Sequence, residues 1–281
     1  MSELAPTRPV LRYLGSKWRL APKIIPWLPP HEIYVEPFGG AAAVLASKPR
    51  VRQEVWNDLD GEVVNLFQVL RSGSAAALMR AVELTPYARA EHKLAYERVD
   101  DPIERARRLL VRSHMGHGTN GTQIELRNGF RIDGYAGRTN VGDEWGAFAG
   151  QLELWISRMR GVLLEQRPAT ELIDRYDSPG VLLYVDPPYL PETRSTSVRW
   201  MTGKCAYAHE MTIGEHEQLL DQLNASSAMV VLSSYPSPAY DAALRHWRRL
   251  ELAARAHRNS PRTELLWINQ AAAAAHGLFA A

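Results

Sequence analysis

The sequence is poor in cysteine and has no long apolar run, and each shortage removes a class of protein. Cys205 is the only cysteine in 281 residues, so an internal disulfide is excluded and a reducing compartment is favoured. No apolar stretch approaches the roughly 20 residues that span a bilayer. The first ten residues, MSELAPTRPV, lack a cationic segment followed by an apolar core, which argues against a secretory signal. We therefore expect a cytoplasmic protein without a membrane segment.

Lysine is also scarce, because the 33 basic residues comprise 28 Arg and 5 Lys. The net charge is only +2, yet the basic residues gather in two segments. Residues 98–138 hold eight Arg against five acidic residues, and residues 245–262 hold six Arg against one Glu. Codon usage in a GC-rich genome is one explanation. The other is a polyanionic partner, since Arg is a good bidentate ligand of phosphate.

The order of the expected elements predicts an α/β fold. A short apolar strand at 33–35, a glycine turn and a second strand ending at Asp58 open a βαβ unit. Helical periodicity then fills residues 62–112 and returns at 152–164, with an irregular, glycine-rich stretch at 116–150. Residues 181–185, 228–236 and 262–270 are expected to be strands, with a helix at 215–226. We therefore predict a core formed by residues 1–65 and 161–281, interrupted by a mainly helical inserted lobe at 66–160.

A glycine turn follows the first strand in the run EPFGG, residues 36–40. Glycines there allow a ligand to approach the backbone, although a tight turn needs glycine for steric reasons alone. Asp58 lies 18 residues beyond Gly40, near the spacing at which an acidic residue binds ribose hydroxyls in nucleoside-binding βαβ units. The pair therefore favours a nucleoside-containing cofactor, either a dinucleotide or an adenosyl compound.

The strand at residues 181–185 ends abruptly in Asp186, Pro187, Pro188 and Tyr189. Two successive prolines fix two φ angles and remove two N–H donors, so strand pairing must end there. The bend holds Asp186 and Tyr189 in fixed places at the carboxyl end of a strand, where open α/β sheets bind ligands. Carboxylate and carbonyl oxygens accept hydrogen bonds from a planar amine, and a tyrosine ring can stack on a heterocycle. A purely structural proline turn is the alternative.

Three further features remain ambiguous from the residues alone. Lys17 follows a Gly-Ser turn in LRYLGSKWRL and is either a ligand-binding group or a solvated lysine at a helix start. His114 and His117 have no cysteine nearby and no acidic residue in the same turn, so we expect loop histidines and no metal site. The run SSYPSP lacks the glycine elbow of a serine nucleophile and is expected to end a core strand beside the pocket.

Taken together and in order, LRYLGSKWRL, YVEPFGGAAAVL, NDLD and DPPY resemble the Dam-type, or D12 class, of DNA adenine-N6 methyltransferases. The resemblance covers roughly residues 10–270. It implies a Rossmann-like S-adenosylmethionine-dependent methyltransferase core with an inserted target-recognition domain. It also implies a bacterial or phage-encoded enzyme that transfers a methyl group to a flipped-out adenine of DNA, expected to be double-stranded. We expect a monomer.

The resemblance also implies roles for individual residues. The adenine site would comprise Asp186, Pro187, Pro188 and Tyr189. The cofactor pocket would comprise Tyr13, Lys17, Pro37, Phe38, Gly39, Gly40, Asp58 and Asp186. The DNA-binding residues would be Arg12, Asn120, Gly121, Arg127 and Arg131. Thr119 and Ile124 stand where family members often carry an aromatic residue and an arginine, so the recognition sequence and any role in restriction–modification stay open.

Three other functions use some of the same residues. A nicotinamide oxidoreductase would need the glycine turn and Asp58 but would leave the Asp-Pro-Pro-Tyr bend unexplained. A methyltransferase of cytosine N4, or of a glutamine amide, would use related amine chemistry. A non-catalytic DNA-binding module would have no use for a cofactor pocket.

Overall fold

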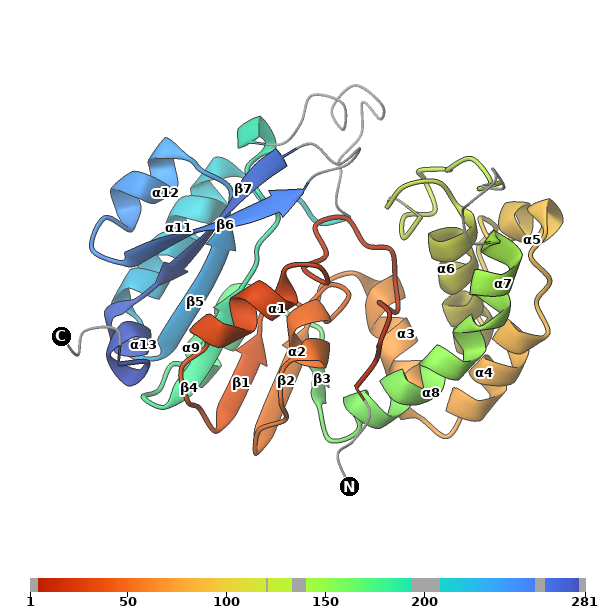
Figure 1. Cartoon of the computed structure of the whole chain (residues 1–281), viewed down its shortest axis with the longest axis horizontal. Helices are drawn as coiled ribbons and strands as arrows, with labels where there is room; N and C mark the ends of the chain where they lie inside the picture. The colour runs from red at the N-terminus through yellow and green to blue at the C-terminus, as the bar shows by residue number, and fades with distance from the viewer. Residues whose placement is uncertain (1–4, 120, 133–139, 194–207, 256–260, 278–281) are drawn as a thin grey trace. The chain divides into compact units, whose positions relative to one another are not determined.

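The computed structural model describes residues 5–119, 121–132, 140–193, 208–255 and 261–277. The chain divides into two compact units (Figure 1). The first comprises residues 1–16 and 60–164, and the second comprises residues 17–59 and 165–281. The helical stretch expected at 66–160 thus falls within the first unit, which also includes the amino-terminal segment.

The described residues form a seven-stranded sheet in the order β3-β2-β1-β4-β5-β7-β6. The pairs β1–β2, β1–β4 and β4–β5 are parallel, whereas β7 runs antiparallel to β5 and β6. The strands are β1 (Ile33–Glu36), β2 (Gln53–Asn57), β3 (Leu163–Glu165), β4 (Val181–Val185), β5 (Met229–Ser234), β6 (Arg248–Arg255) and β7 (Pro261–Ile268). The mostly parallel sheet with intervening helices confirms the predicted α/β class.

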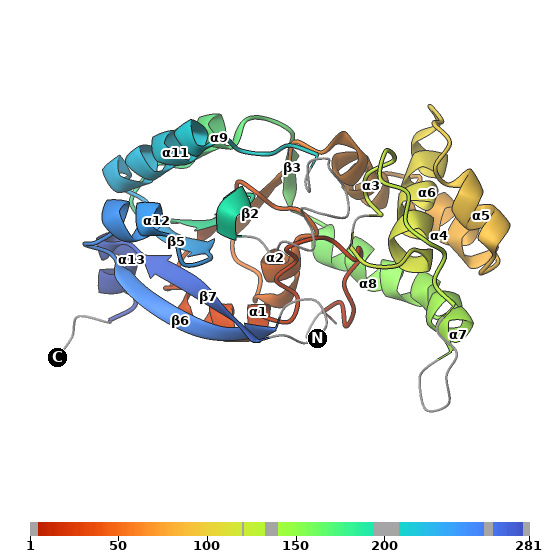
Figure 2. The ribbon, with the colours of Figure 1, turned by 90° about the horizontal axis from the view of Figure 1, so that it is seen from above.

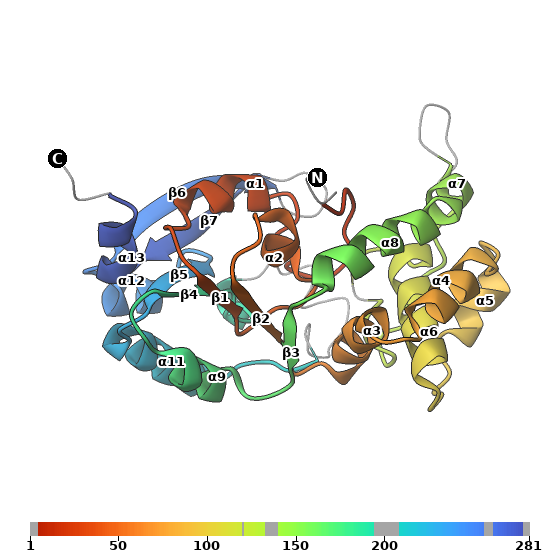
Figure 3. The ribbon, with the colours of Figure 1, turned by 90° about the horizontal axis from the view of Figure 1, so that it is seen from below.

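Helices cover both faces of this sheet (Figures 2 and 3). One face carries α9 and α11, and the other carries α1 and α2. The helices of the second unit are α1 (Ala21–Ile24), α2 (Ala43–Ser47), α9 (Ala169–Tyr176), α11 (Ile213–Ala225), α12 (Pro238–Ala243) and α13 (Gln270–Ala275), with 3-10 turns η1 (Ile25–Trp27) and η2 (Pro191–Thr193). All five residues of β4 are buried, as expected for a central strand covered on both faces.

The first unit is helical and its amino-terminal segment is tied to the helices. Its helices are α3 (Gly61–Arg71), α4 (Ala75–Glu83), α5 (Arg89–Leu94), α6 (Pro102–Met115), α7 (Val141–Gly146) and α8 (Phe148–Met159). Asp60 and Asp101 cap α3 and α6 by accepting backbone N–H bonds, as N-cap carboxylates do. The Trp155 indole donates to the Arg8 carbonyl at 3.0 Å, and the Arg12 amide donates to Ser113 Oγ at 2.7 Å.

The sequence interpretation differs from the structure in three places. Part of the expected irregular stretch, at residues 141–150, is helical in α7 and α8. Strands β3 and β6 were not predicted. The alanine-rich tail, expected to be frayed, forms α13, whose cap Asn269 accepts the Ala272 amide and donates to the Ala228 carbonyl.

Candidate functional site

The strand order brings the predicted motifs to one edge of the sheet. β1 is paired with β2 on one side and with β4 on the other, so the chain reverses its direction of winding at β1. Because these three strands are parallel, the segments that follow them leave at the same edge. Ligands of open α/β sheets bind at such a reversal point, outside the carboxyl ends of the strands.

The glycine turn after β1 is tied to the end of β2. The Gly39 amide donates to the Asn57 carbonyl at 2.7 Å, and the Gly40 amide donates to Asp58 Oδ2 at 2.7 Å. A Cβ on Gly39 would lie 2.1 Å from Nε1 of Trp56, and Gly40 has a φ of 47°. Gly39 is therefore required sterically, and the left-handed backbone at Gly40 favours glycine. Asp58 closes the turn while remaining half-buried.

Pro37 and Phe38 lie between β1 and this turn. The Pro37 carbonyl accepts a hydrogen bond from the Asn57 side chain at 2.8 Å. Phe38 packs against the apolar core cluster of the sheet and remains partly buried. Together these contacts fix the backbone path from β1 into the glycine turn.

Lys17 and Asp186 form an ion pair at the end of β4. The Lys17 ammonium lies 2.7 Å from Asp186 Oδ2. Oδ1 of Asp186 is shielded from solvent and accepts no hydrogen bond from the described residues. Burial raises the pKa of Asp186, while the Lys17 charge opposes that rise. An acceptor is thus held inside the protein with one oxygen paired and the other without a donor.

Tyr189 is almost wholly buried and its hydroxyl donates to Glu264 Oε1. The Lys17 ammonium lies 4.7 Å from the centre of the Tyr189 ring, within the range of a cation–π contact. The Tyr235 ring makes a T-shaped contact with the Tyr189 ring, with centroids 4.5 Å apart. Pro187 is buried and Pro188 half-buried between Asp186 and Tyr189. The bend after β4 is therefore held by contacts at both of its ends.

The sequence interpretation did not single out Glu264, and it assigned no role to Tyr235. Glu264 is a charged residue near the start of an apolar strand, β7, and that exception to the pattern was the available signal. Its carboxylate lies 3.6 Å from the Lys17 ammonium, and burial raises its pKa. Tyr235 follows β5 and is half-buried, with the Arg262 guanidinium 4.5 Å from its ring centre.

Glu36, at the end of β1, is a further buried carboxylate in the second unit. Its Oε1 accepts the Tyr34 hydroxyl at 2.6 Å and the Leu45 amide at 2.8 Å. Burial raises the pKa of Glu36 to about 7, and the negative charge of Asp186 contributes to the rise. The Leu45 amide connects the end of β1 with α2, whereas the Tyr34 hydroxyl holds the carboxylate from within β1.

The residues expected to bind DNA lie in differing surroundings in the first unit. Arg12 and Arg131 both pair with Glu144, Arg12 at 3.4 Å. Arg131 is buried, whereas Arg127 is exposed, with its guanidinium 5.8 Å from the Tyr96 ring centre. Among these arginines, Arg127 is therefore the one best exposed to a phosphate.

Gly121 is buried, and a Cβ there would lie 2.4 Å from the Arg112 carbonyl oxygen. Its own carbonyl accepts a hydrogen bond from Arg112 Nε at 3.1 Å. Close packing thus explains this glycine. Asn120 lies outside the described residues.

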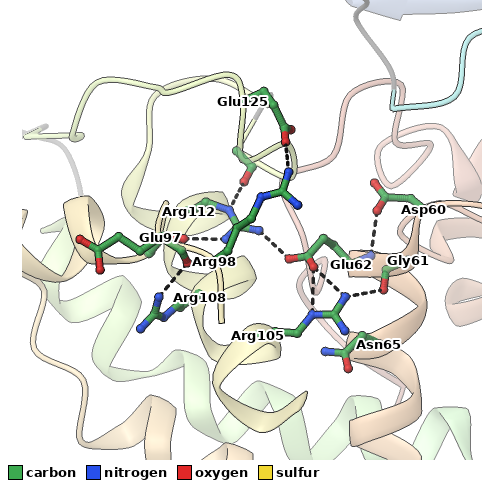
Figure 4. A network of polar contacts seen from close by, with 12 residues as sticks. Asp60, Gly61, Glu62, Asn65, Glu97, Arg98, Arg105, Arg108, Arg112 and Glu125 are labelled. Atoms are coloured by element: carbon green, nitrogen blue, oxygen red, sulfur yellow. Dashed lines mark hydrogen bonds and ion pairs between the residues drawn. The ribbon is translucent and has the colours of Figure 1, made fainter. Parts of the chain in front are cut away.

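Arg112 is the centre of a polar network in this unit (Figure 4). It is 1% exposed and donates to the Ala95 carbonyl at 2.6 Å and to Glu62 at 3.0 Å. Glu62 also binds Arg105 at 2.8 Å. A cavity of about 220 Å³ beside the network is lined by both signs of charge: Glu62, Glu97, Asp100, Arg98, Arg105, Arg108 and Arg112, with Val99 and Ile124. We interpret the network as a brace that connects α3, α6 and the turn at Gly121.

Tyr13 is half-buried in the amino-terminal segment, and its carbonyl accepts the Ser16 amide at 3.2 Å. His114 is bonded through Nε2 to the Val10 carbonyl at 2.9 Å, and burial lowers its pKa to about 4. Within the described part of the chain, no cluster of three or more His, Cys, Asp or Glu could hold a metal ion.

No helix in the described ranges is long and apolar enough to cross a membrane. Comparison with protein families gives a match to the D12 class N6 adenine-specific DNA methyltransferases over residues 13–249. None of the curated proteins compared with the chain matches it significantly.

Proposed function

The chain belongs to the D12 class of N6 adenine-specific DNA methyltransferases, and from this premise we propose that Asp186 receives the N6 amine of the target adenine. Its α/β core is thus a Rossmann-like methyltransferase fold and its reaction is DNA adenine-N6 methylation. The family match supports neither cytosine N4 methylation nor a nicotinamide oxidoreductase. The observation that carries the proposal is the buried Oδ1 of Asp186, which accepts no hydrogen bond from the described residues while Oδ2 is held by Lys17.

The methyl donor of this family is S-adenosylmethionine, and the residues beside β1 suit a nucleoside compound. The turn at Gly40 has no Cβ and a positive φ, and the half-buried Asp58 carboxylate follows at the end of β2. We propose that the cofactor pocket of the second unit is lined by Lys17, Pro37, Phe38, Gly39, Gly40, Asp58 and Asp186. Tyr13, the remaining residue of the expected pocket, belongs to the first unit. When bound, the cofactor supplies an electrophilic methyl group.

The chain's own residues then have to activate a poor nucleophile. The N6 lone pair of adenine is delocalised into the ring, and a hydrogen bond from N6–H to Asp186 Oδ1 increases the electron density on nitrogen. The transfer would form an N6–methyl bond, break the methyl–sulfur bond of the donor to leave S-adenosylhomocysteine, and release one proton from N6. Oδ1 of Asp186 is placed to receive this proton, because burial raises the pKa of the carboxyl. The Lys17 charge opposes the rise in the pKa of Asp186 and thereby favours the ionised carboxylate before the amine arrives.

Tyr189 and Tyr235 are proposed to contact the adenine ring. Reaching N6 requires the base to leave the duplex, at a cost of about a few kcal/mol. Aromatic stacking offsets part of this cost, at about 1–3 kcal/mol per base. Tyr189 is nearly buried, whereas Tyr235 is half-buried and makes a T-shaped contact with it. We therefore infer that Tyr235 supplies the more accessible ring.

Incubation of unmethylated plasmid DNA with labelled S-adenosylmethionine tests the proposal directly. Nucleoside analysis should find N6-methyladenine, and mapping of modified bases should give the recognition sequence. Parallel reactions with single strands test the expected preference for duplex DNA, and sedimentation tests the expected monomer. N4-methylcytosine as the product, or no methylated base, would refute the function.

The variant Asp186→Asn tests the assigned residue. It should lose methylation by about 100-fold or more, because the amide presents a weaker acceptor than a carboxylate. Asp241→Asn is the matched control, since Asp241 is exposed on α12 of the same unit. If Asp186→Asn retained the rate of the control while folded, Asp186 would not be the acceptor of the amine.

A further inference from the structure

Three segments distant in sequence meet around Tyr189. Lys17 precedes α1, Asp186 and Tyr189 follow β4, and Glu264 lies near the start of β7. β7 runs antiparallel to β5, so its first residues lie at the edge where β5 ends, with Leu265 paired to Ser234. This topology delivers Glu264 to the carboxyl edge of the parallel strands.

Glu264 is buried at 2% exposure, where an ionised carboxylate is costly unless it is paired. It has two partners that belong to the proposed active site. Its Oε1 accepts the Tyr189 hydroxyl and lies 3.6 Å from the Lys17 ammonium. Lys17 is closer to Asp186, at 2.7 Å, so one ammonium is shared unequally between two carboxylates.

We propose that Glu264 is a positioning residue for methyl transfer, acting through Tyr189 and Lys17 and not by touching the adenine. This inference rests on the proposed function of Asp186. Glu264 fixes the Tyr189 hydroxyl, and it draws the Lys17 ammonium so that Asp186 is not fully occupied by its counter-ion. The aromatic ring and the free carboxylate oxygen are thereby kept in one relative orientation.

The combined charge of Lys17, Asp186 and Glu264 supports a role for Glu264 beyond packing. With both carboxylates ionised, Glu264, Asp186 and Lys17 carry a net charge of −1. Four titratable groups interact electrostatically or by hydrogen bonds with Glu264. They are Lys17 before α1, Asp186 and Tyr189 in the bend after β4, and Tyr184 on β4. Because the two carboxylates repel one another, loss of the Glu264 charge should lower the pKa of Asp186.

Two substitutions distinguish the effect of the charge of Glu264 from the effect of its side-chain length. Glu264→Gln keeps the length and an acceptor for Tyr189 but removes the negative charge that faces the Lys17 ammonium. Glu264→Asp keeps the charge and shortens the side chain by one methylene. Glu251→Gln is the matched control, because Glu251 is an exposed glutamate on the neighbouring strand β6.

The measurements are kcat and KM for DNA methylation across pH, together with the thermal midpoint of each variant. Glu264→Gln should lower kcat/KM by about tenfold or more, the effect of losing a hydrogen-bonded charge. The acidic limb of its plot of kcat/KM against pH should also move to lower pH, because Asp186 ionises more readily in this variant. Glu264→Asp should lower kcat/KM while its acidic limb stays near that of the wild type.

The outcomes separate this inference from the proposed function. If Glu264→Gln matched Glu251→Gln in kcat, KM and acidic limb, or changed the thermal midpoint alone, the positioning role would be refuted. Should Glu264→Gln fail to fold, a Glu264→Asp variant with unchanged kcat/KM would refute the role by itself. A wild-type enzyme that yields no N6-methyladenine would instead refute the proposed function.

Discussion

Lys17 and Asp186 form a largely buried ion pair, 2.7 Å between Nζ and Oδ2, at the carboxyl edge of the sheet. Only one oxygen of Asp186 is engaged by the lysine, and the other accepts no hydrogen bond from the described residues. An ion pair of this kind contributes little to the stability of the fold, because the cost of desolvating both charges offsets their attraction. Its geometry is better explained by chemistry, since it keeps an acceptor ionised and oriented inside a low-dielectric site.

Glu36 should make the stability of the protein depend on pH. Its pKa is raised by burial from an ordinary 4.5 to about 7, so the folded state holds its proton more tightly than the unfolded state does. Its contribution is complete below pH 4.5 and is lost as pH rises through about 7, at a cost of about 3 kcal/mol. Denaturant unfolding of wild type and Glu36→Gln between these pH values should show a steeper decline in the wild type than in the variant, which keeps the raised pKa values of Asp186 and Glu264.

The exposed Glu217 on α11 gives the control for this titration, and Glu217→Gln should retain the wild-type slope. A Glu36→Gln protein whose stability declines with pH as steeply as the wild type would show that another group titrates.

Gly39→Ala should destabilise the protein by about 1–3 kcal/mol, the usual cost of overpacking. The added Cβ would lie 2.1 Å from Nε1 of Trp56, so the turn or the indole must shift. Gly214→Ala is the matched control, because a Cβ at Gly214 in α11 meets nothing within 4 Å. Thermal denaturation of both variants checks the prediction, which fails if Gly39→Ala melts with or above Gly214→Ala.

Arg112→Leu should destabilise the protein by about 3–5 kcal/mol, because it leaves the carboxylate of Glu62 with fewer partners and the Ala95 and Gly121 carbonyls without a donor. Mapping of modified bases should also show relaxed sequence selectivity, since the turn at Gly121 loses its brace. The exposed Arg98→Leu supplies the comparison. Equal thermal midpoints for the two variants would contradict the role of Arg112 as a brace.

Arg127 and Arg131 should respond differently to substitution. Arg127→Ala removes an exposed guanidinium, so DNA affinity should fall and the slope of log affinity against log salt should decrease by about one. Arg131→Ala removes a buried partner of Glu144, so the thermal midpoint should fall. Titrations of DNA binding at several salt concentrations, with melting curves, distinguish these effects. An unchanged salt slope in Arg127→Ala would remove this residue from the DNA interface.

The central strands were predictable because their signal is local. Val181–Val185 is a continuous apolar run closed by two prolines, and β4 has these bounds. β6 was missed because Arg248–Arg255 mixes charged and apolar residues without clear alternation, and it lies at the edge of the sheet. α7 was missed because its N-cap, Asn140, stands inside a glycine-rich stretch whose composition outweighed the capping signal.

Within the candidate site, the turn and the bend could be predicted because each is a contiguous motif. The pairing of Lys17 with Asp186 and Glu264 could not, because it depends on which strands become neighbours. The same limit applies to the pairing of Arg131 with Glu144, because that glutamate lies on α7, a helix that the sequence interpretation lacked.

The amino-terminal segment is bonded to α6 and α8 at Ser113 and Trp155, within the unit that holds residues 60–164. That unit is therefore assembled from two stretches of the gene that are not adjacent. A chimaera that takes the helical stretch from a relative must therefore also take that relative's counterpart of residues 1–16. Otherwise α6 and α8 lose the segment to which they are hydrogen-bonded.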